Sequence, residues 1–224
     1  MIELPPSLAS TYEAVITQEV FSWSYGAVQR VRSVGANDWQ GRRGTLDDES
    51  TFGPRLDDRC ACGKYVGRQH RGIICDACGV KVAVAQPARR TRFGHINLQG
   101  PIPHPFGDEP LALEALPVLP VSFRASAAGS GVDDLYERVL LASEAGDLRA
   151  VPARFEELAA KLMPILTQAH AWNLLEADQF ARALCLERRD VMTGERERCT
   201  SCGYPLAGLK GEACPWCGDT LADG

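Results

Sequence analysis

The sequence has no apolar run long enough to cross a bilayer. Its longest apolar stretches are broken by charged residues or proline, well before the roughly 20 residues that a membrane-spanning helix needs. Residues 1–6 also lack the basic and then apolar pattern of a secretory signal. With 224 residues, 45% of them hydrophobic, the chain can bury a core of ordinary size. We therefore expect a globular, cytoplasmic protein.

Patterns that indicate catalysis are missing as well. We find no nucleophile next to a base, no glycine-rich loop that could cradle a phosphate and no paired carboxylates. His95 and His104 have no acidic partner or nucleophile nearby in the sequence, so we predict hydrogen-bonded structural roles for both. The sequence thus gives no ground for assigning a reaction to this chain.

Eight of the nine cysteines occur in close pairs, which is the spacing of metal ligands and not of a disulfide scaffold. The first two pairs, Cys60/Cys62 and Cys75/Cys78, are separated by twelve residues. Four thiolates suit a tetrahedral Zn²⁺, and a following glycine lets the backbone curl around the metal. Because sulfur takes all four positions, no place is left for an activated water. We predict a structural zinc site.

The other two pairs, Cys199/Cys202 and Cys214/Cys217, are separated by eleven residues and form two matched CxxCG motifs. This pattern is typical of a zinc ribbon, although a rubredoxin-like iron site uses the same motifs. The short separation favours zinc, so we expect two zinc ions per chain. The ninth cysteine, Cys185, lies in an apolar pattern of helical period, and we predict an inert buried thiol.

These observations predict an α+β protein built from small modules. We expect short strands around the first cysteine cluster, including one at Val80, Val82 and Val84, and a helix-compatible segment at 12–21. Residues 101–120 hold six of the fourteen prolines, which indicates an extended connector. The predicted modules are a lead-in at 1–50, a four-cysteine zinc-binding domain at 51–105, a connector at 106–131, a helical region at 132–195 and the zinc ribbon at 196–224.

The helical region contains two strong periodic patterns. The first begins near residue 130 and can end at Gly146, and its apolar stripe consists of Leu135, Tyr136, Val139 and Leu140. The second can begin at Pro152 and is kinked or ended by Pro164. With only a short turn between them, the two helices should pack as an antiparallel hairpin. A third helix is predicted over 174–189.

Charge is unevenly distributed along the chain. Residues 55–92 hold nine Lys or Arg against three Asp, whereas residues 106–197 hold sixteen acidic residues against nine basic ones. A basic segment is typical of contact with a polyanion, and an acidic one of contact with solvent or a basic protein. We therefore expect the two halves to meet different partners, unless both are merely solvated faces.

The first cysteine cluster and its flanks contain four motifs: Phe52-Gly53-Pro54, Cys60-x-Cys62-Gly63-Lys64-Tyr65, His70-Arg71-Gly72-Ile73-Ile74-Cys75-x-x-Cys78-Gly79-Val80-x-Val82 and Arg89-Arg90-x-Arg92-x-Gly94-His95-Ile96. These motifs resemble the N-terminal zinc-binding clamp region of the bacterial RNA polymerase β′ subunit. The resemblance covers roughly residues 51–105, and Ser22-Trp23-Ser24-Tyr25-Gly26 is similar to the element that precedes this region in the family. The ribbon looks like an appended module.

The resemblance implies two sets of contacts. Its position near the nucleic-acid path in the family makes six basic residues candidates for phosphate contacts: Lys64, Arg68, Arg71, Arg89, Arg90 and Arg92. A shorter similarity, in residues 116–120 and 133–139, is to the segment that leads into the sigma-binding clamp helices. It implies that the helix pair at 132–163 is a shortened clamp hairpin and that Leu135, Tyr136 and Arg138 contact a partner. The alternative is a generic helical hairpin.

Two departures from the family limit what the resemblance implies. The triple-aspartate motif that holds catalytic Mg²⁺ in the family is absent from the 224 residues, so this chain alone is not expected to polymerise RNA. In addition, Val66 and Gly67 occupy positions where lysine or arginine is common in the family. We consider three hypotheses: a non-catalytic clamp-like protein that binds nucleic acid, sigma factor or polymerase; a piece of a divergent or split polymerase; and a zinc-stabilised scaffold without nucleic-acid binding.

Overall fold

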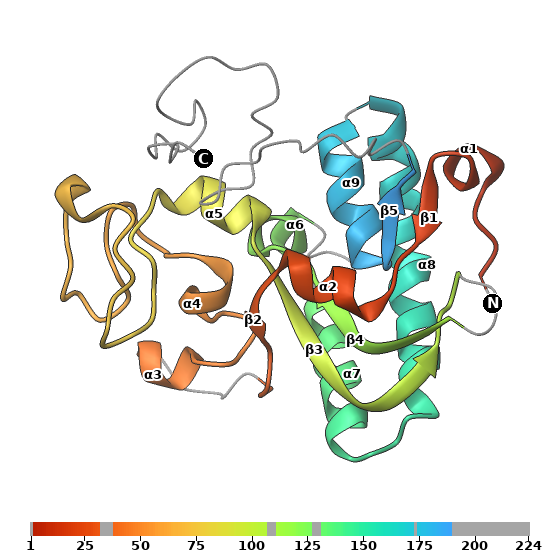
Figure 1. The fold of residues 1–224 in the computed structure, drawn as a ribbon, viewed down its shortest axis with the longest axis horizontal. Coiled ribbons are helices and arrows are strands. Elements are labelled where there is room, and N and C mark those ends of the chain that lie inside the picture. The colour runs from red at the N-terminus through yellow and green to blue at the C-terminus, as the bar shows by residue number, and fades with distance from the viewer. Residues whose placement is uncertain (1, 32–37, 107–110, 127–130, 173, 190–224) are drawn as a thin grey trace.

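The computed structural model describes residues 2–31, 38–106, 111–126, 131–172 and 174–189. Within them the chain is a mixture of helices and small sheets (Figure 1), which confirms the α+β prediction. The predicted second metal cluster, with Cys199, Cys202, Cys214 and Cys217, lies outside the described residues. No helix in the described part is both long and apolar enough to cross a membrane.

The elements fall into a cysteine-rich module and a larger body of helices and strands (Figure 1). The helices are α1 (Pro6–Ala9), α2 (Thr17–Trp23), α3 (Trp39–Arg42), α4 (Glu49–Phe52), η1 (Arg68–His70), α5 (Ala85–Thr91), α6 (Val121–Ser126), α7 (Val132–Glu144), α8 (Ala150–Trp172) and α9 (Leu174–Ala183). The strands are β1 (Tyr12–Ala14), β2 (Ser24–Ala27), β3 (Phe93–Pro103), β4 (Ala112–Val118) and β5 (Leu186–Arg188).

The sheet of the body has the order β2-β3-β4. β3 runs parallel to β2 and antiparallel to β4, with Ile96 opposite Leu116, and the register shifts between Asn97 and Ile102. The parts of the proline-rich stretch that lie in β3 and β4 are therefore extended, as predicted. They are paired into the sheet, however, and Ile96 and Leu116 lie in the core. Pro101 lies where the ladder is interrupted, at the register shift, whereas Pro103 and Pro117 are paired with Ala112 and His95.

A second sheet joins segments from the two ends of the described chain. β1 pairs antiparallel with β5, so that Tyr12 lies opposite Arg188 and Ala14 opposite Leu186. The predicted helix at 12–21 is wrong for its first residues, because they form β1. The predicted third helix also ends early, at Ala183. Cys185 is buried, as predicted, but it lies in a turn with φ 58° that directs the chain into β5.

The helices α7 and α8 form the predicted hairpin and pack on the sheet (Figure 1). All four residues of the predicted stripe on α7 are buried, and Gly146 follows the helix with φ 70°, a conformation that glycine adopts without strain. α8 continues through Pro164 to Trp172, so the prediction that proline could end this helix is wrong. Leu166, beyond the proline, is buried, and this packing offsets the lost backbone hydrogen bond.

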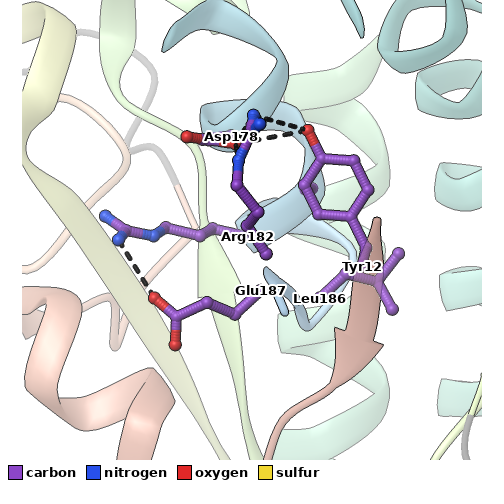
Figure 2. Close-up of a pocket in the computed structure, with 7 residues that line it drawn as sticks. Tyr12, Asp178, Arg182, Leu186 and Glu187 are labelled. Carbon is purple, nitrogen blue, oxygen red and sulfur yellow. Dashed lines mark hydrogen bonds and ion pairs between the residues drawn. The ribbon is translucent and has the colours of Figure 1, made fainter. Parts of the chain in front are cut away.

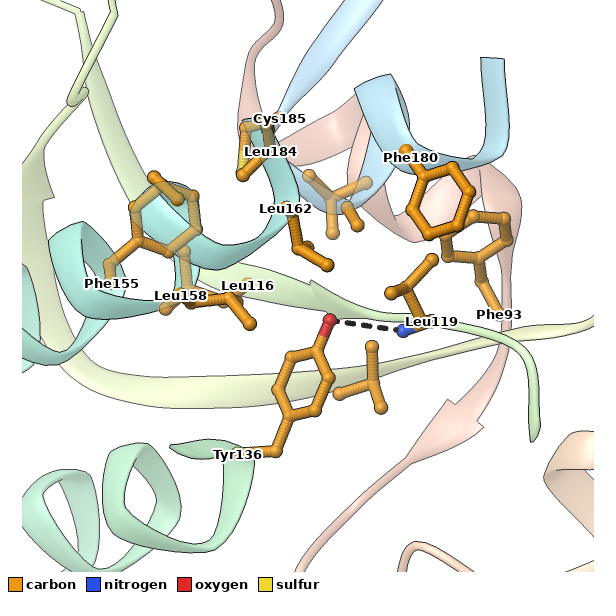
Figure 3. Close-up of a cluster of buried hydrophobic side chains, with 14 of the residues drawn as sticks. Phe93, Leu116, Leu119, Tyr136, Phe155, Leu158, Leu162, Phe180, Leu184 and Cys185 are labelled. Atoms are coloured by element: carbon orange, nitrogen blue, oxygen red, sulfur yellow. Dashed lines mark hydrogen bonds between the residues drawn. The ribbon is translucent and has the colours of Figure 1, made fainter. Parts of the chain in front are cut away.

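The main core lies between the sheet and helices α7, α8 and α9 (Figure 3). Leu116, Leu162 and Phe155 are buried there. The backbone N–H of Leu119 donates a hydrogen bond of 3.2 Å to the hydroxyl of Tyr136, as the dashed line in Figure 3 shows. This bond ties the end of β4 to α7. The cysteine-rich module contributes its own, much smaller cluster.

Candidate metal centre

The four cysteines of the first cluster converge on one point. The Sγ atoms of Cys60 and Cys62 lie 3.6 Å apart, as do those of Cys62 and Cys75. The four sulfur atoms, including that of Cys78, lie within 4.8 Å of one another. A tetrahedron of sulfurs at about 2.3 Å from Zn²⁺ has edges of about 3.8 Å. The arrangement therefore fits a four-coordinate metal ion.

Two similar turns present the cysteines to this point. In the first, the N–H of Cys60 donates to the carbonyl of Tyr65 at 3.1 Å, and the N–H of Gly63 donates to the carbonyl of Cys60 at 3.1 Å. In the second, the N–H of Cys75 donates to the carbonyl of Val80 at 3.0 Å. Gly79 closes this turn with φ 74°, and Gly63 has φ 80°. Glycine suits both turns because a side chain is strained at such angles.

Burial and mutual contact set the protonation of the thiols before a metal arrives. For Cys75, burial acts to raise the pKa, but N–H groups of residues 77 and 78 and the neighbouring thiols lower it to about 7. For Cys62, a backbone N–H lowers the pKa, yet burial and the three other thiols raise it to about 12. The thiol of Cys75 therefore ionises near neutral pH, whereas a metal ion must displace the proton of Cys62.

The module has few other groups that could hold it together. Its buried cluster consists of three of the cysteines with Val80 and Val82, against which a few partly buried side chains pack. The predicted strand at 80–84 is wrong, because only an isolated bridge between Ile74 and Lys81 forms there. A closed site of four thiolates that binds zinc would supply the folding energy that so small a core lacks.

Three of the six predicted phosphate-contacting residues lie on the cysteine-rich module. The ammonium of Lys64 donates to Asp76 at 2.7 Å, and Arg71 forks onto the carboxylate of Asp58. Arg68 lies 3.7 Å from the same carboxylate, and its side chain is 86% exposed. Arg68 is therefore the cation of the three that is most accessible to a polyanion.

The other three predicted residues hold α5 against the rest of the molecule. Arg89 donates to the backbone carbonyl of Gly53 at 3.1 Å, and burial lowers its pKa. Arg90 pairs with Glu176 of α9 at 2.8 Å. Arg92 is buried, with its guanidinium 5.0 Å from the ring centre of Tyr25. In this arrangement the three guanidinium groups interact with other residues of the fold.

The predicted partner-binding residues are also divided between core and surface. Leu135 and Tyr136 are buried, so their side chains contact the body of the protein. Arg138 is 47% exposed and forms ion pairs with Asp134, one turn earlier on α7, and with Glu157 of α8 at 3.5 Å. Of the three, Arg138 is the side chain that faces solvent.

Both histidines form hydrogen bonds, as predicted. His104 lies 3.2 Å from the backbone carbonyl of Cys185 through its Nε2. His95 makes a hydrogen bond of 2.7 Å through Nδ1 with the hydroxyl of Ser24, and burial lowers its pKa. The sequence did not reveal this hydroxyl partner, because it stands 71 positions earlier. The contact joins β2 to β3 and thus has a structural role.

A small pocket lies where β1, α9 and β5 meet (Figure 2). Arg188 pairs with Asp178 at 2.6 Å, and Arg182 pairs with Glu187 at 3.2 Å. Tyr12 donates to the same Asp178 at 3.2 Å, and burial together with this carboxylate raises the pKa of Tyr12 to about 12. The charged groups satisfy one another, so this site locks the two ends of the described chain together.

The chain is similar to β′ subunits of bacterial RNA polymerase. It is 45% identical over 86 residues to DNA-directed RNA polymerase subunit beta' of Lactobacillus gasseri and 46% identical over 86 residues to that of Streptococcus agalactiae. The match covers 38% of this chain and spans only 7% of each relative's length. No family model matches the chain. Part of the chain is therefore homologous to a small part of the β′ subunit.

Proposed function

We propose that this chain is a non-catalytic, β′-like zinc protein that engages RNA polymerase, sigma factor or nucleic acid during transcription. The observation that carries the proposal is the homology to β′ over 86 residues in a chain whose cysteines are arranged for a metal. Such a module modulates transcription by binding, and its site of action is the cytoplasm.

The proposed cofactor is zinc, with two ions per chain. Cys60, Cys62, Cys75 and Cys78 would hold the first, and the spacing of Cys199, Cys202, Cys214 and Cys217 supports a second. In the first site four thiolates complete the coordination of the metal, which leaves no position for water or substrate. Zinc bound there would hold the two turns in place and would not take part in a reaction.

The proposed nucleic-acid contacts are electrostatic and independent of base sequence. Of the six basic candidates, Arg68 is favoured because its side chain is 86% exposed, and Lys64 is 47% exposed beside Asp76. Arg71, Arg89, Arg90 and Arg92 would act indirectly, by fixing the surface that carries these two cations. Arg138, on the α7–α8 hairpin, is the proposed contact for sigma factor or polymerase.

Direct binding of purified components tests this function. The zinc-loaded protein is titrated separately with core polymerase, sigma factor and duplex DNA, all from the source organism, at several salt concentrations. We expect nuclease-resistant binding to core polymerase or sigma factor, or salt-sensitive binding to DNA. Arg68→Glu should weaken DNA binding and reduce its salt dependence. The control Arg149→Glu makes the same charge change at an exposed residue of the α7–α8 turn. Absence of binding to all three components would reject the proposal and favour the scaffold hypothesis.

A further inference from the structure

Each of the two cysteine turns has an arginine guanidinium against its glycine. Gly63 directly follows the ligand Cys62, and a Cβ added to this glycine would lie 3.2 Å from Nη2 of Arg59. Gly79 directly follows the last ligand of the second turn, and a Cβ added there would lie 3.9 Å from Nη2 of Arg43. Because neither glycine has a side chain, a guanidinium fits beside each pair of sulfur ligands.

Arg43 reaches the second turn from outside the predicted zinc-binding domain. It directly follows α3, which lies on the same side of the molecule as the cysteine-rich loops (Figure 1). Trp39, at the start of α3, packs against the buried cysteine cluster. Ser50 also lies against Gly79, with its Cβ 3.7 Å from the position of an added Cβ. The segment from Trp39 to Ser50 is thus packed on the cysteine module, and this packing brings Arg43 to the second turn.

The charge of a four-thiolate site gives these two cations a chemical role. Four thiolates around one Zn²⁺ leave a net charge of about −2 on the site. The charged pair nearest the turns does not offset this charge, because Lys64 and Asp76 neutralise each other at 2.7 Å. No ion pair within the described part of the chain includes Arg43 or Arg59. Their positive charges therefore remain available to the metal site.

Both guanidiniums are close enough to act on that charge. Consecutive Cα atoms are about 3.8 Å apart, so a group that contacts either glycine lies within about 12 Å of the preceding cysteine sulfur. Screening by salt acts over about 10 Å at 0.1 M ionic strength and over about 30 Å at 0.01 M. In water, one cation at about 10 Å from a dianion changes the affinity for the metal by about threefold to fivefold.

We propose that Arg43 and Arg59 compensate the negative charge of the metal site, each from its own cysteine turn. They do not bind the metal; they stabilise the metal-bound site because it carries more negative charge than the metal-free one. The inference rests on the proposed zinc site. It goes beyond that proposal, because it gives a role in retaining the metal to two residues that the cysteine pattern does not single out.

Zinc affinity of the full-length protein, measured by competition with a chelator, tests the proposal. Every protein compared carries Cys199→Ser and Cys214→Ser, so that only the first site is measured. At about 0.01 M salt, Arg59→Gln and Arg43→Gln should each weaken zinc binding by about threefold to fivefold, and the two together by about 10-fold. At about 1 M salt, where screening acts over about 3 Å, these differences should disappear.

Two further variants separate charge from packing. Arg59→Lys and Arg43→Lys keep the positive charge and should bind zinc within about twofold of the unchanged arginines. Arg149→Gln is the matched control, because it removes the same charge from an exposed residue of the α7–α8 turn; it should leave the affinity unchanged. Arg43 and Arg59 are exposed as well, so their replacement should not unfold the protein.

Two results would overturn this inference alone. Zinc binding that the two glutamine variants leave unchanged at low salt would show that the guanidiniums do not act on the metal site. A loss that is equal at low and high salt, or that the lysine variants share, would assign the two side chains to packing. If the protein with both arginines binds no zinc, the zinc site itself is rejected and the inference falls with it. The two proposals can therefore be told apart.

Discussion

Loss of the metal should unfold the cysteine module and leave the rest of the protein folded. In Cys78→Ser a thiolate of the proposed site is replaced by a poor zinc ligand. The module then retains mainly Val80 and Val82 as buried aliphatic residues, worth about 1.5–3 kcal/mol each. A structural zinc ion contributes on the order of 10 kcal/mol or more. Two valines cannot replace it, because ordering each residue of the module costs about 1–2 kcal/mol.

Hydrogen exchange measured by mass spectrometry follows this unfolding segment by segment. We expect Cys78→Ser, or treatment with a chelator, to remove protection from residues 58–82 and to leave α7 and α8 protected. β3 should also stay protected, although it lies within the predicted domain at 51–105, because its residues Phe93 and Ile96 belong to the main core. Cys185→Ala is the control, since this buried thiol is far from the site in sequence and absent from the cysteine cluster.

The outcomes distinguish a cysteine module that the metal folds from one that folds without the metal. Cys185→Ala should lower the stability of the main core and keep both zinc and the protection of residues 58–82. If Cys78→Ser keeps that protection, the metal is not what folds the module. If it removes protection from the whole chain at the same rate, the module and the body unfold as one unit, and the argument from separate cores is wrong.

Further predictions concern the core and the protonation of the site. Arg124→Met removes a guanidinium that donates to two buried backbone carbonyls and should lower the free energy of unfolding by about 3–5 kcal/mol; Asp133→Asn, at its 57% exposed partner, should cost less than about 1 kcal/mol. Both are checked by urea denaturation, and equal losses would contradict the reasoning. Tyr136→Phe leaves a buried N–H without its acceptor and should cost about 1–3 kcal/mol in the same assay. Affinity for zinc, measured by competition with a chelator, should fall between about pH 8 and pH 6, because the metal must displace protons from thiols such as that of Cys62, whose pKa is raised to about 12; an affinity independent of pH would show that the thiols are already ionised.

Local sequence patterns predicted the elements that depend on local interactions. The stripe on α7 and its glycine stop follow from helical periodicity and from the freedom of glycine. The cysteine pairs predicted a convergent four-sulfur site, because short turns bring such residues together whatever the rest of the fold does. Residues 60–62 and 75–78 show this most directly.

Long-range pairing explains what the sequence did not reveal. β4 pairs with β3 across a proline-rich stretch, and no local pattern shows that two such segments are partners. The same holds for the cations: the sequence shows the charge of Arg90 and Arg92, but not Glu176 and Tyr25, with which they interact. Basic residues that lie close together in sequence can therefore make contacts inside a fold as well as on its surface.

The central claim is tested most directly by recovering the protein from its own cells. The tagged chain is purified under mild conditions, with and without nuclease, and the proteins and nucleic acids that remain bound are identified. If the chain acts in transcription, polymerase subunits or sigma factor should remain after nuclease treatment, or nucleic acid should be present in the untreated sample. Recovery of neither would contradict a role in transcription and leave the homology to β′ as a record of ancestry alone.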